Sequence, residues 1–321
     1  MIVDELYKKM LFPSRKILLS IVSDNRKNFR VVVLNKGTEK ERIVFAPKLV
    51  TKTCQQFILD KYLSHLVPSE YVVSYQKHKS IIDVPKPHME NKYFLHLDIK
   101  HYFNRMSWNK FVVIVDENFP NSNLNKCLKN NLDAKFLKSI LCFKDKIVQG
   151  SVTSPHISNL YLYDFDKFVG ELIRTIPDGA YSRYSDDIYI SSSRYINHSI
   201  IEDIKNKLSE YDLKLNYQKI KYTKLKNSIR ITGLSLTTDR RLVLNTKFKK
   251  SLKKEIYQAI KNKGKGTNFN HLFGCIYYLK SVNPEYFSII QRKYGKGDIV
   301  VTDILKDLRK NLESLSRDKT C

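Results

Sequence analysis

Three acidic residues stand out in a strongly basic chain. Asp186 and Asp187 are adjacent in the segment RYSDDIYI, and Asp98 ends the apolar segment FLHLD. An isolated Asp-Asp pair is most often ordinary turn chemistry, and a single Asp at a strand end can simply accept a backbone hydrogen bond. Three carboxylates brought together would instead bind hard divalent cations such as Mg²⁺. Two such cations can clamp the attacking and leaving oxygens of a phosphoryl transfer.

The residues around these carboxylates predict strands that would bring them together. Residues 93–103 read as a strand whose alternation ends in an aspartate and two aromatic residues. Residues 180–192 read as a hairpin with the two adjacent aspartates at its tip. Because successive strand residues point to opposite faces, one of these two aspartates should face the strand that carries Asp98.

The rest of the chain alternates between strand-like and helical segments. Ser154 is a plausible N-cap for a helix that Pro155 opens. The order of the elements predicts an α+β architecture with a helical appendage at the C-terminus. The other predicted elements are a basic helical lead-in at 1–28, a hairpin at 30–45, helices at 50–66 and over roughly 107–142, and a strongly basic helical region from about 246.

The charge of the chain predicts a polyanionic partner. Lys and Arg number 57 against 32 Asp and Glu, which gives a formal net charge of +25 and a sequence pI near 9.7. Such a chain is attracted to nucleic acid through its phosphates. A ribosome-like RNA-binding protein or a generally basic surface would carry the same charge, so charge alone says nothing about chemistry.

Composition excludes several classes of protein. A chain of 321 residues with 42% hydrophobic residues can bury a core, so the whole chain is not disordered. Its apolar runs are shorter than a membrane span, and its start has no apolar stretch of signal-peptide length. Five scattered cysteines form no CxxC pair, so neither a disulfide framework nor a zinc knuckle is indicated. We therefore expect a protein of a reducing cytoplasm, without a membrane partner.

Three segments in order resemble the polymerase palm of reverse transcriptases. They are LHLDIKHYF at 95–103, QGSVTSPHISNL at 149–160 and RYSDDIYI at 183–190, the last matching the family pattern Tyr-x-Asp-Asp. The resemblance implies a right-hand polymerase fold with fingers, a palm built of an antiparallel sheet plus helices, and a helical thumb.

The same resemblance divides the chain into three parts. It implies N-terminal helices and fingers at 1–92, and a palm at 93–245 with an interleaved fingers segment at about 107–150. It implies a basic helical thumb and C-terminal tail at 246–321.

The resemblance also implies roles for single residues. Asp98, Asp186 and Asp187 would be catalytic and would bind two Mg²⁺ ions, for which Mn²⁺ could substitute, with the backbone carbonyl of Ile99 as a further ligand. Phe103 matches the aromatic residue that blocks a ribose 2′-OH, and a core aromatic is the alternative. The nucleotide-binding residues implied in this way are Lys40, Arg42, Phe103, Gln149, Gly150 and Lys219. For the first two, a solvated charge cluster explains the sequence equally well.

A third group of residues is implied to contact RNA or DNA. His88 belongs to it by its place in the family pattern, although a lone histidine between Pro87 and Met89 is more often structural. The whole group is His88, Ser154, Asn159, Gly233, Lys249, Lys250, Lys253, Lys254, Tyr277, Arg292 and Lys293.

Within the family, the compact chain is similar to retron reverse transcriptases. The segment at 273–295 resembles the retron thumb, which recognises an RNA stem-loop, and Ile231-Thr232-Gly233 stands where retrons have Val-Thr-Gly. The chain departs from the retron pattern at two places. Val84-Pro85 replaces Asn-Ala, and His101-Tyr102 replaces an acidic residue and Phe.

The retron resemblance implies a bacterial enzyme that uses dNTPs to copy part of its cognate structured non-coding RNA. Synthesis would start from the 2′-OH of a guanosine, give a branched RNA–DNA product (msDNA), and serve anti-phage defence with an effector protein encoded nearby. Two alternatives remain open. One is another small bacterial reverse transcriptase of the defence or abortive-infection kind, and the other is a non-catalytic RNA-binding scaffold.

Overall fold

The computed structural model describes residues 2–9, 16, 18, 20, 21, 25–38 and 41–317. The chain forms two compact units, Met1–Lys224 and Leu225–Cys321. The first unit contains all three of the acidic residues singled out above, and the second contains the basic helices.

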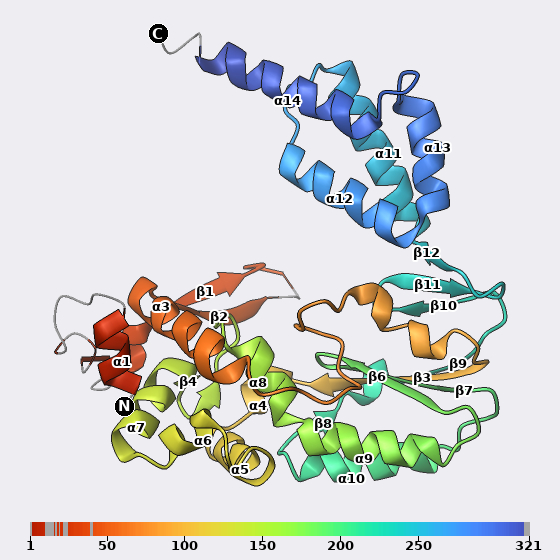
Figure 1. Cartoon of the computed structure of the whole chain (residues 1–321). Coiled ribbons are helices and arrows are strands. Elements are labelled where there is room, and N and C mark those ends of the chain that lie inside the picture. The colour runs from red at the N-terminus through yellow and green to blue at the C-terminus, as the bar shows by residue number, and fades with distance from the viewer. Residues whose placement is uncertain are drawn as a thin grey trace. The chain divides into compact units, whose positions relative to one another are not determined.

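An antiparallel sheet organises the first unit (Figure 1). Its central strand β3 pairs along one edge with β7 and along the other with β8 and β9, and β6 pairs with the far edge of β7. The strands are β3 (Tyr93–Lys100), β6 (Ala180–Tyr184), β7 (Asp187–Ser192), β8 (Lys214–Leu215) and β9 (Lys221–Lys224).

The two faces of this sheet have different residues because strand side chains alternate. Leu95 and Leu97 of β3 are register partners of Ile190 and Ile188 of β7, and all four are buried in one hydrophobic cluster. Helices α9 (Tyr163–Arg174) and α10 (Ser199–Ser209) run beneath one face of the sheet (Figure 1). The intervening residues of β3 and β7, which include Asp98 and Asp187, point to the opposite face.

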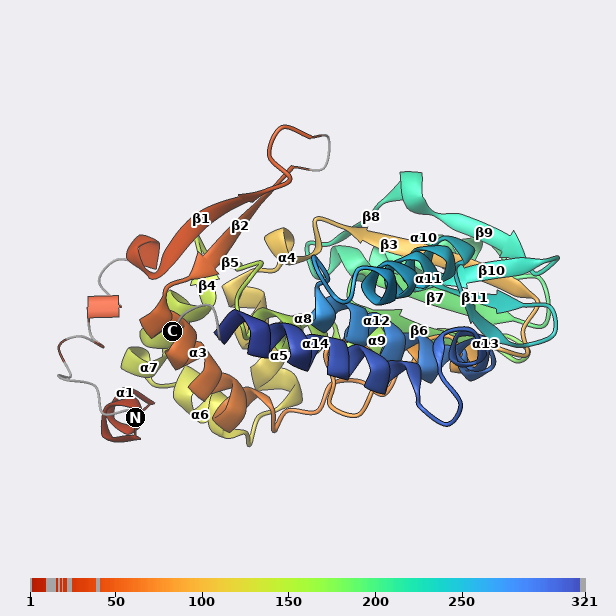
Figure 2. The same cartoon turned by 90° about the horizontal axis from the view of Figure 1, so that it is seen from above.

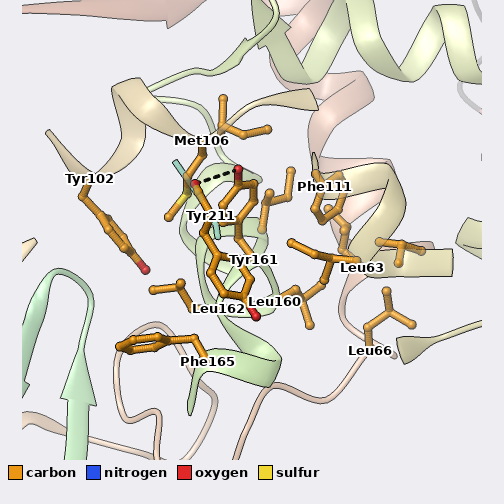
Figure 3. Packing of buried hydrophobic residues seen from close by; sticks show 14 of the residues in the cluster. Leu63, Leu66, Tyr102, Met106, Phe111, Leu160, Tyr161, Leu162, Phe165 and Tyr211 are labelled. Atoms are coloured by element: carbon orange, nitrogen blue, oxygen red, sulfur yellow. Dashed lines mark hydrogen bonds between the residues drawn. The ribbon is translucent and has the colours of Figure 1, made fainter. Parts of the chain in front are cut away.

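Helices at the other end of the first unit enclose the continuation of this core. Figure 3 shows Phe111, Leu160, Tyr161 and Phe165 packed together with Leu63. The helices are α1 (Ile2–Lys9), α3 (Leu49–Ile58), α5 (Trp108–Asn118), α6 (Asn123–Leu128), α7 (Asn131–Leu141) and α8 (Ser154–Tyr161), and a π-helical turn, η2 (Leu59–Leu63), follows α3.

The helical stretch expected at 107–142 is confirmed and consists of three helices. Each begins at a side chain that caps it: the Ser107 hydroxyl accepts a bond from the Lys110 amide, and Ser122 and Asn130 cap α6 and α7 in the same way. These caps explain where one helix ends and the next begins.

The hairpin expected at 30–45 is confirmed as β1 (Phe29–Leu34) and β2 (Arg42–Pro47), which project from α3 and α7 (Figure 2). A second small hairpin joins β4 (Cys142–Phe143) to β5 (Lys146–Ile147). The short helical turns of this unit are η1 (Asn25–Asn28), η3 (Ile81–Asp83), η4 (Lys86–His88) and η5 (Tyr217–Lys219).

The second unit combines a three-stranded antiparallel sheet with a helical bundle. The two-residue turn Thr232-Gly233 joins the first two strands, and both of its residues have positive φ, as a tight hairpin turn requires. The strands are β10 (Ser228–Ile231), β11 (Leu234–Thr237) and β12 (Leu242–Leu244), and the helices are α11 (Thr246–Lys261), α12 (Phe269–Val282), α13 (Pro284–Tyr294) and α14 (Val301–Arg317). The expected helical region from about 246 is confirmed.

Two expectations about local structure are corrected. The strand expected at 93–103 ends at Lys100, because His101 adopts a left-handed conformation (φ 54°) that starts helix α4 (Tyr102–Arg105). Ser154 does not cap a helix, because it is already the first residue of α8, and its hydroxyl donates to the Val148 carbonyl oxygen at 2.6 Å.

Two findings concern the described residues alone. No helix there is long and apolar enough to cross a membrane. Four of the five cysteines lie in the described part of the chain, and each is free: Cys54, Cys127, Cys142 and Cys275.

Candidate active site

The sheet brings the three aspartates to one place. Asp98 near the end of β3 is the direct register partner of Asp187 at the start of β7. Asp186 precedes Asp187 in the turn, and its carbonyl oxygen accepts a hydrogen bond from the Ile99 amide at 2.9 Å. One of the paired aspartates therefore faces the Asp98 strand, as the alternation predicts.

The turn between β6 and β7 is held on both sides of Ser185. This residue has a left-handed conformation (φ 58°), which is uncommon for a residue with a side chain. Its amide donates to the Ser74 hydroxyl at 2.9 Å, and its carbonyl oxygen accepts from the Arg183 guanidinium at 3.0 Å. These bonds hold the turn in the conformation that places Asp186 and Asp187.

Arg183 is completely buried and connects several elements. Its guanidinium forms a bidentate pair with Asp166 of α9, with both N–O distances at 2.7 Å, and also donates to the Tyr102 hydroxyl at 2.7 Å. Burial alone would lower the pKa of Arg183, but the neighbouring Asp166 carboxylate raises it above its usual value. The side chain therefore stays charged, and it ties the turn to α9 and α4.

Two side chains near β8 hold the Asp98 carboxylate. Asn216 donates to one carboxylate oxygen at 3.0 Å, and the Lys219 ammonium lies 2.8 Å from the other. The hydrogen bond to Asp98 raises the pKa of Lys219, and the charges of Asp186 and Asp187 raise it further. Burial raises the pKa of Asp186, and the charges of the other two aspartates add to this rise. The three carboxylates are therefore close enough to affect one another.

Asp187 is held from a neighbouring strand position. The Nε2 atom of His96 lies 2.7 Å from one carboxylate oxygen of Asp187, and the His96 ring stacks on Tyr189. His96 lies two residues before Asp98 on β3, so all four side chains lie on the same face of the sheet.

The donor set fits hard divalent cations by its chemistry. Besides burial, the charges of Asp98 and Asp187 help to raise the pKa of Asp186, and the three carboxylates raise the pKa of Lys219. The site therefore favours positive charge. In the described part of the chain, no three His, Cys, Asp or Glu side chains are arranged as a formed metal site. Both oxygens of Asp98 are engaged, with Asn216 and Lys219, whereas His96 contacts only one oxygen of Asp187. The Lys219 ammonium would therefore have to move away from Asp98 for the two carboxylates to bind a cation together.

The loop before α8 lies against the β1–β2 hairpin. The Phe45 amide donates to the Gln149 carbonyl oxygen at 3.3 Å. Gly150 has φ +100°, and a Cβ atom at this position would lie only 3.1 Å from a methyl group of Val44. The structure therefore brings the expected nucleotide-binding residues Gln149 and Gly150 to the hairpin. Arg42 begins β2, and Lys40 lies outside the described residues.

Phe103 follows the strand that carries Asp98. It lies in α4, is partly buried, packs against the hydrophobic cluster, and meets the ring of Tyr102 edge to face at 5.1 Å. Both interpretations of this residue, a block beneath the sugar and a core aromatic, are compatible with a ring that is half covered.

Three residues expected to contact nucleic acid lie in the interior. Both ring nitrogens of His88 bond to the hydroxyls of Ser191 and Ser182, at 2.7 and 2.8 Å, and burial lowers its pKa to about 3. Ser154 and Asn159 are also buried, and Asn159 bonds to Ser74, whose hydroxyl accepts from the Ser185 amide in the turn that carries Asp186 and Asp187. These contacts favour structural roles for the three side chains, as weighed above for His88, over direct contact with RNA or DNA.

The remaining residues expected to bind nucleic acid lie in the second unit. Gly233 occupies the β10–β11 turn, where no atom would obstruct a Cβ. On α11, Lys249 is partly buried over the Tyr286 ring at 4.7 Å, and Lys253 is partly buried beside it. The exposed members of this group are Lys250, Lys254, Tyr277, Arg292 and Lys293.

Sequence reasoning missed His96 and Arg183. His96 could have been found from the spacing His-x-Asp on a strand, because residues two apart share a face. Arg183 has no comparable signal, since an arginine on a strand is exposed more often than buried.

Comparison with known proteins identifies the family of this chain. The model for "Reverse transcriptase (RNA-dependent DNA polymerase)" matches residues 33–236, which is more than half of the chain. The chain belongs to the reverse transcriptase family. This reverse transcriptase is 25% identical to the retron Ec83 reverse transcriptase of Escherichia coli over 299 residues, which cover 90% of this chain and 93% of the relative. It is 24% identical to the retron Ec86 reverse transcriptase of the same organism, covering 83% and 82%.

These relatives identify a retron-type enzyme, that is, an RNA-directed DNA polymerase. Reverse transcriptases depend on divalent metal and act on RNA, so the same holds in general terms for this one.

A solved structure supports the fold. Telomerase from Candida tropicalis, determined with a fragment of telomeric RNA, matches with a TM-score of 0.51 and 12% identity over 87% of this reverse transcriptase and 58% of the telomerase chain. This reverse transcriptase thus spans a little over half of the telomerase chain. The expected α+β right-hand polymerase fold is confirmed.

Proposed function

We propose that this reverse transcriptase copies part of a cognate structured non-coding RNA into single-stranded DNA, starting from the 2′-OH of a guanosine in that RNA. The branched RNA–DNA product would be msDNA. The observation that supports this most strongly is the pairing of Asp98 with Asp187 in a chain whose relatives are retron enzymes. A non-catalytic scaffold would have no use for three carboxylates beside phosphates.

Asp98, Asp186 and Asp187 would hold two Mg²⁺ ions, with the Ile99 carbonyl as a further ligand. Bound there, the two ions would supply the charge that activates the attacking hydroxyl and stabilises the leaving pyrophosphate. The Ser185 contacts hold Asp186 and Asp187 at the start of β7. The two carboxylates are therefore positioned before a substrate binds and need not be reoriented in each round of nucleotide addition.

Lys219 would protonate the leaving pyrophosphate. Its ammonium lies beside Asp98, and the raised pKa keeps the proton on the side chain at neutral pH. Its side chain is more than half exposed, so it can turn from Asp98 toward a bound nucleotide.

The dNTP would lie against the β1–β2 hairpin and the Gln149–Gly150 loop, which contact each other and would form one side of its site. Lys40 and Arg42 would hold the triphosphate, and Phe103 would exclude a ribose 2′-OH. In the second unit, the exposed cations of α11 and α13 would follow the phosphates of the RNA and of the RNA–DNA duplex, and Gly233 would lie at the primer end.

Two further roles complete the proposal. A protein encoded nearby would act as effector, and the complex would serve anti-phage defence, as the retron resemblance implies.

The test is to express the protein with its native upstream locus, purify it, and analyse the bound nucleic acid by nuclease sensitivity, sequencing and debranching. The matched control is Asp186→Ala/Asp187→Ala, which should still bind RNA. We expect single-stranded DNA joined to RNA through a 2′ branch in the wild type and RNA alone in the control. RNA alone in both samples would contradict the proposal. DNA of a sequence that matches no co-purified RNA would instead indicate a template-independent defence enzyme.

A further inference from the structure

Four side chains form a square on the open face of the sheet. His96 and Tyr189 are cross-strand register partners, and so are Asp98 and Asp187. The contact between His96 and Asp187 runs along a diagonal of this square, with Nε2 2.7 Å from the carboxylate oxygen Oδ1. The square therefore contains two carboxylates, one donor to a carboxylate, and one aromatic ring.

Tyr189 fixes the orientation of the His96 ring. The two rings are nearly parallel, with an interplanar angle of 14° and centroids 4.7 Å apart, and Tyr189 itself is only 7% exposed. Aromatic cross-strand pairs of this kind stabilise a sheet and restrict both side chains. The stacked ring is thus held with its Nε2 edge toward Asp187.

The polarity of the contact follows from the carboxylate. An ionised carboxylate only accepts hydrogen bonds, so Nε2 of His96 carries the proton that it donates to Asp187. The bond occupies Oδ1 and restricts rotation of the carboxylate, while Asp187 keeps 32% of its side chain exposed. The second oxygen of Asp187 is therefore the one presented to a ligand.

The register partners Asp98 and Asp187 each accept hydrogen bonds from side chains, but the donors belong to different elements. Asp98 accepts bonds from Asn216 and Lys219, which follow β8, whereas Asp187 accepts its bond from His96 on the same strand as Asp98. Strand β3 thus carries both one carboxylate and the side chain that orients the other.

We propose that His96 is a positioning residue that orients the Asp187 carboxylate for divalent-cation binding, with Tyr189 holding the His96 ring in place. This inference rests on the proposed function, in which Asp187 is a cation ligand. Partners that hydrogen-bond to ligating carboxylates typically change metal affinity or activity about 10- to 100-fold when removed. We expect an effect of that size for the loss of the His96 donor.

The variants separate the donor from the ring. His96→Phe keeps a ring to stack on Tyr189 and removes the donor. His96→Gln keeps an N–H donor at a similar reach, and His96→Asn, one methylene shorter, keeps the amide but falls short of Asp187. The matched control is His198→Phe, because His198 stacks on Tyr222 in nearly the same geometry (15° and 5.1 Å), away from the carboxylates.

The first measurement is Mn²⁺ binding to the protein without nucleic acid, followed by electron paramagnetic resonance. The second is the Mg²⁺ concentration at half-maximal extension of a supplied primer–template. We expect the Mn²⁺ dissociation constant and the Mg²⁺ concentration at half-maximal extension to rise about 10- to 100-fold for His96→Phe and His96→Asn. Both values should be close to those of the wild type in His96→Gln and unchanged in His198→Phe. Melting temperatures establish that each variant is folded, and the Asn and Gln pair decides the matter if the Phe variant is not.

The result that overturns the inference is wild-type Mn²⁺ binding in folded His96→Asn or His96→Phe. Asp187→Asn, measured in parallel, separates this failure from failure of the proposed function. If Asp187→Asn loses Mn²⁺ binding and the His96 variants do not, only the role of His96 is wrong. If Asp187→Asn binds Mn²⁺ and synthesises DNA as the wild type does, the proposed cation site is wrong and the inference falls with it.

Discussion

His88 is a titratable side chain that is buried as a neutral group between two serine hydroxyls. Burial lowers its pKa from 6.5 to about 3 in the folded protein. Because the folded pKa lies below the unfolded one, the stability from His88 is complete above about pH 6.5 and is lost as the pH falls from 6.5 toward 3, at about 1.4 kcal/mol per pH unit. Wild-type protein should therefore lose roughly 2 kcal/mol more than His88→Gln between pH 7 and pH 5.

Urea unfolding of both proteins at the two pH values checks this prediction. The same pH dependence in His88→Gln as in the wild type would show that other groups govern acid stability.

Asp166 neutralises the buried Arg183, and we expect its removal to be costly. Asp166→Ala leaves a fully buried guanidinium without its counter-ion, which should lower the free energy of unfolding by about 3–5 kcal/mol. The control is Glu70→Ala, which breaks the exposed Arg174–Glu70 pair and should cost less than about 1 kcal/mol. Denaturant unfolding of both variants measures the difference, and similar losses would mean that the buried pair contributes no more than a surface one.

Phe103 carries the prediction about sugar selection. Replacing it with Val or Ala removes the bulk that would lie beneath the ribose, so ribonucleotide incorporation should rise relative to deoxynucleotide incorporation. Single-nucleotide extension with each substrate measures the ratio of kcat/KM values. Phe168→Val is the control, since Phe168 of α9 is likewise a partly buried aromatic residue packed against the same hydrophobic cluster. Unchanged discrimination in Phe103→Val would assign Phe103 to the core alone.

At the scale of elements, a glycine substitution tests how tightly the Gln149–Gly150 loop packs against the β1–β2 hairpin. Gly150→Ala should lower the melting temperature and activity, because φ +100° is strained for alanine and its Cβ would press on Val44. Gly274→Ala in α12 should instead stabilise by about 0.5–1 kcal/mol, since its Cβ meets nothing within 4 Å. Thermal unfolding of the two variants tests both signs, and a stabilised Gly150→Ala would mean that the loop relaxes freely.

A structural feature could be predicted from the sequence where residues close to it in the chain determine it. That one of Asp186 and Asp187 faces the strand of Asp98 follows from alternation along the strands, and the break before α6 follows from a serine cap. The register that makes Asp187 the partner of Asp98 does not follow from alternation. The end of β3 does not, because the left-handed conformation of His101 depends on its surroundings. Nor does the Asp166–Arg183 pair, since two residues that usually lie at the surface are buried here by the packing of α9 on the sheet. Tertiary packing thus decided what local pattern could not.

At the scale of the whole molecule, the net charge of +25 predicts RNA binding that depends steeply on salt. Lys250→Glu/Lys254→Glu changes two exposed cations of α11 and should reduce the slope of log affinity against log salt by about 2 if each neutralises one phosphate. The control, Lys129→Glu/Lys205→Glu, makes the same charge change at lysines already paired with Asp116 and Glu202. Filter binding across a salt series measures both, and equal slopes for the two double variants would exclude a specific role for α11.

The side chains that hold Asp98 and Asp187 lie far from them along the chain. Asn216 and Lys219 are 118 and 121 residues beyond Asp98, and Asp187 is 91 residues beyond His96. Contacts of such long range form slowly in folding, because a large loop must close before they can be made. During translation, a nascent chain that has passed Asp187 but not Asn216 already contains all three aspartates without the donors that hold Asp98. Catalytic competence should therefore arise late in synthesis, after β8 and η5 have left the ribosome and closed against β3.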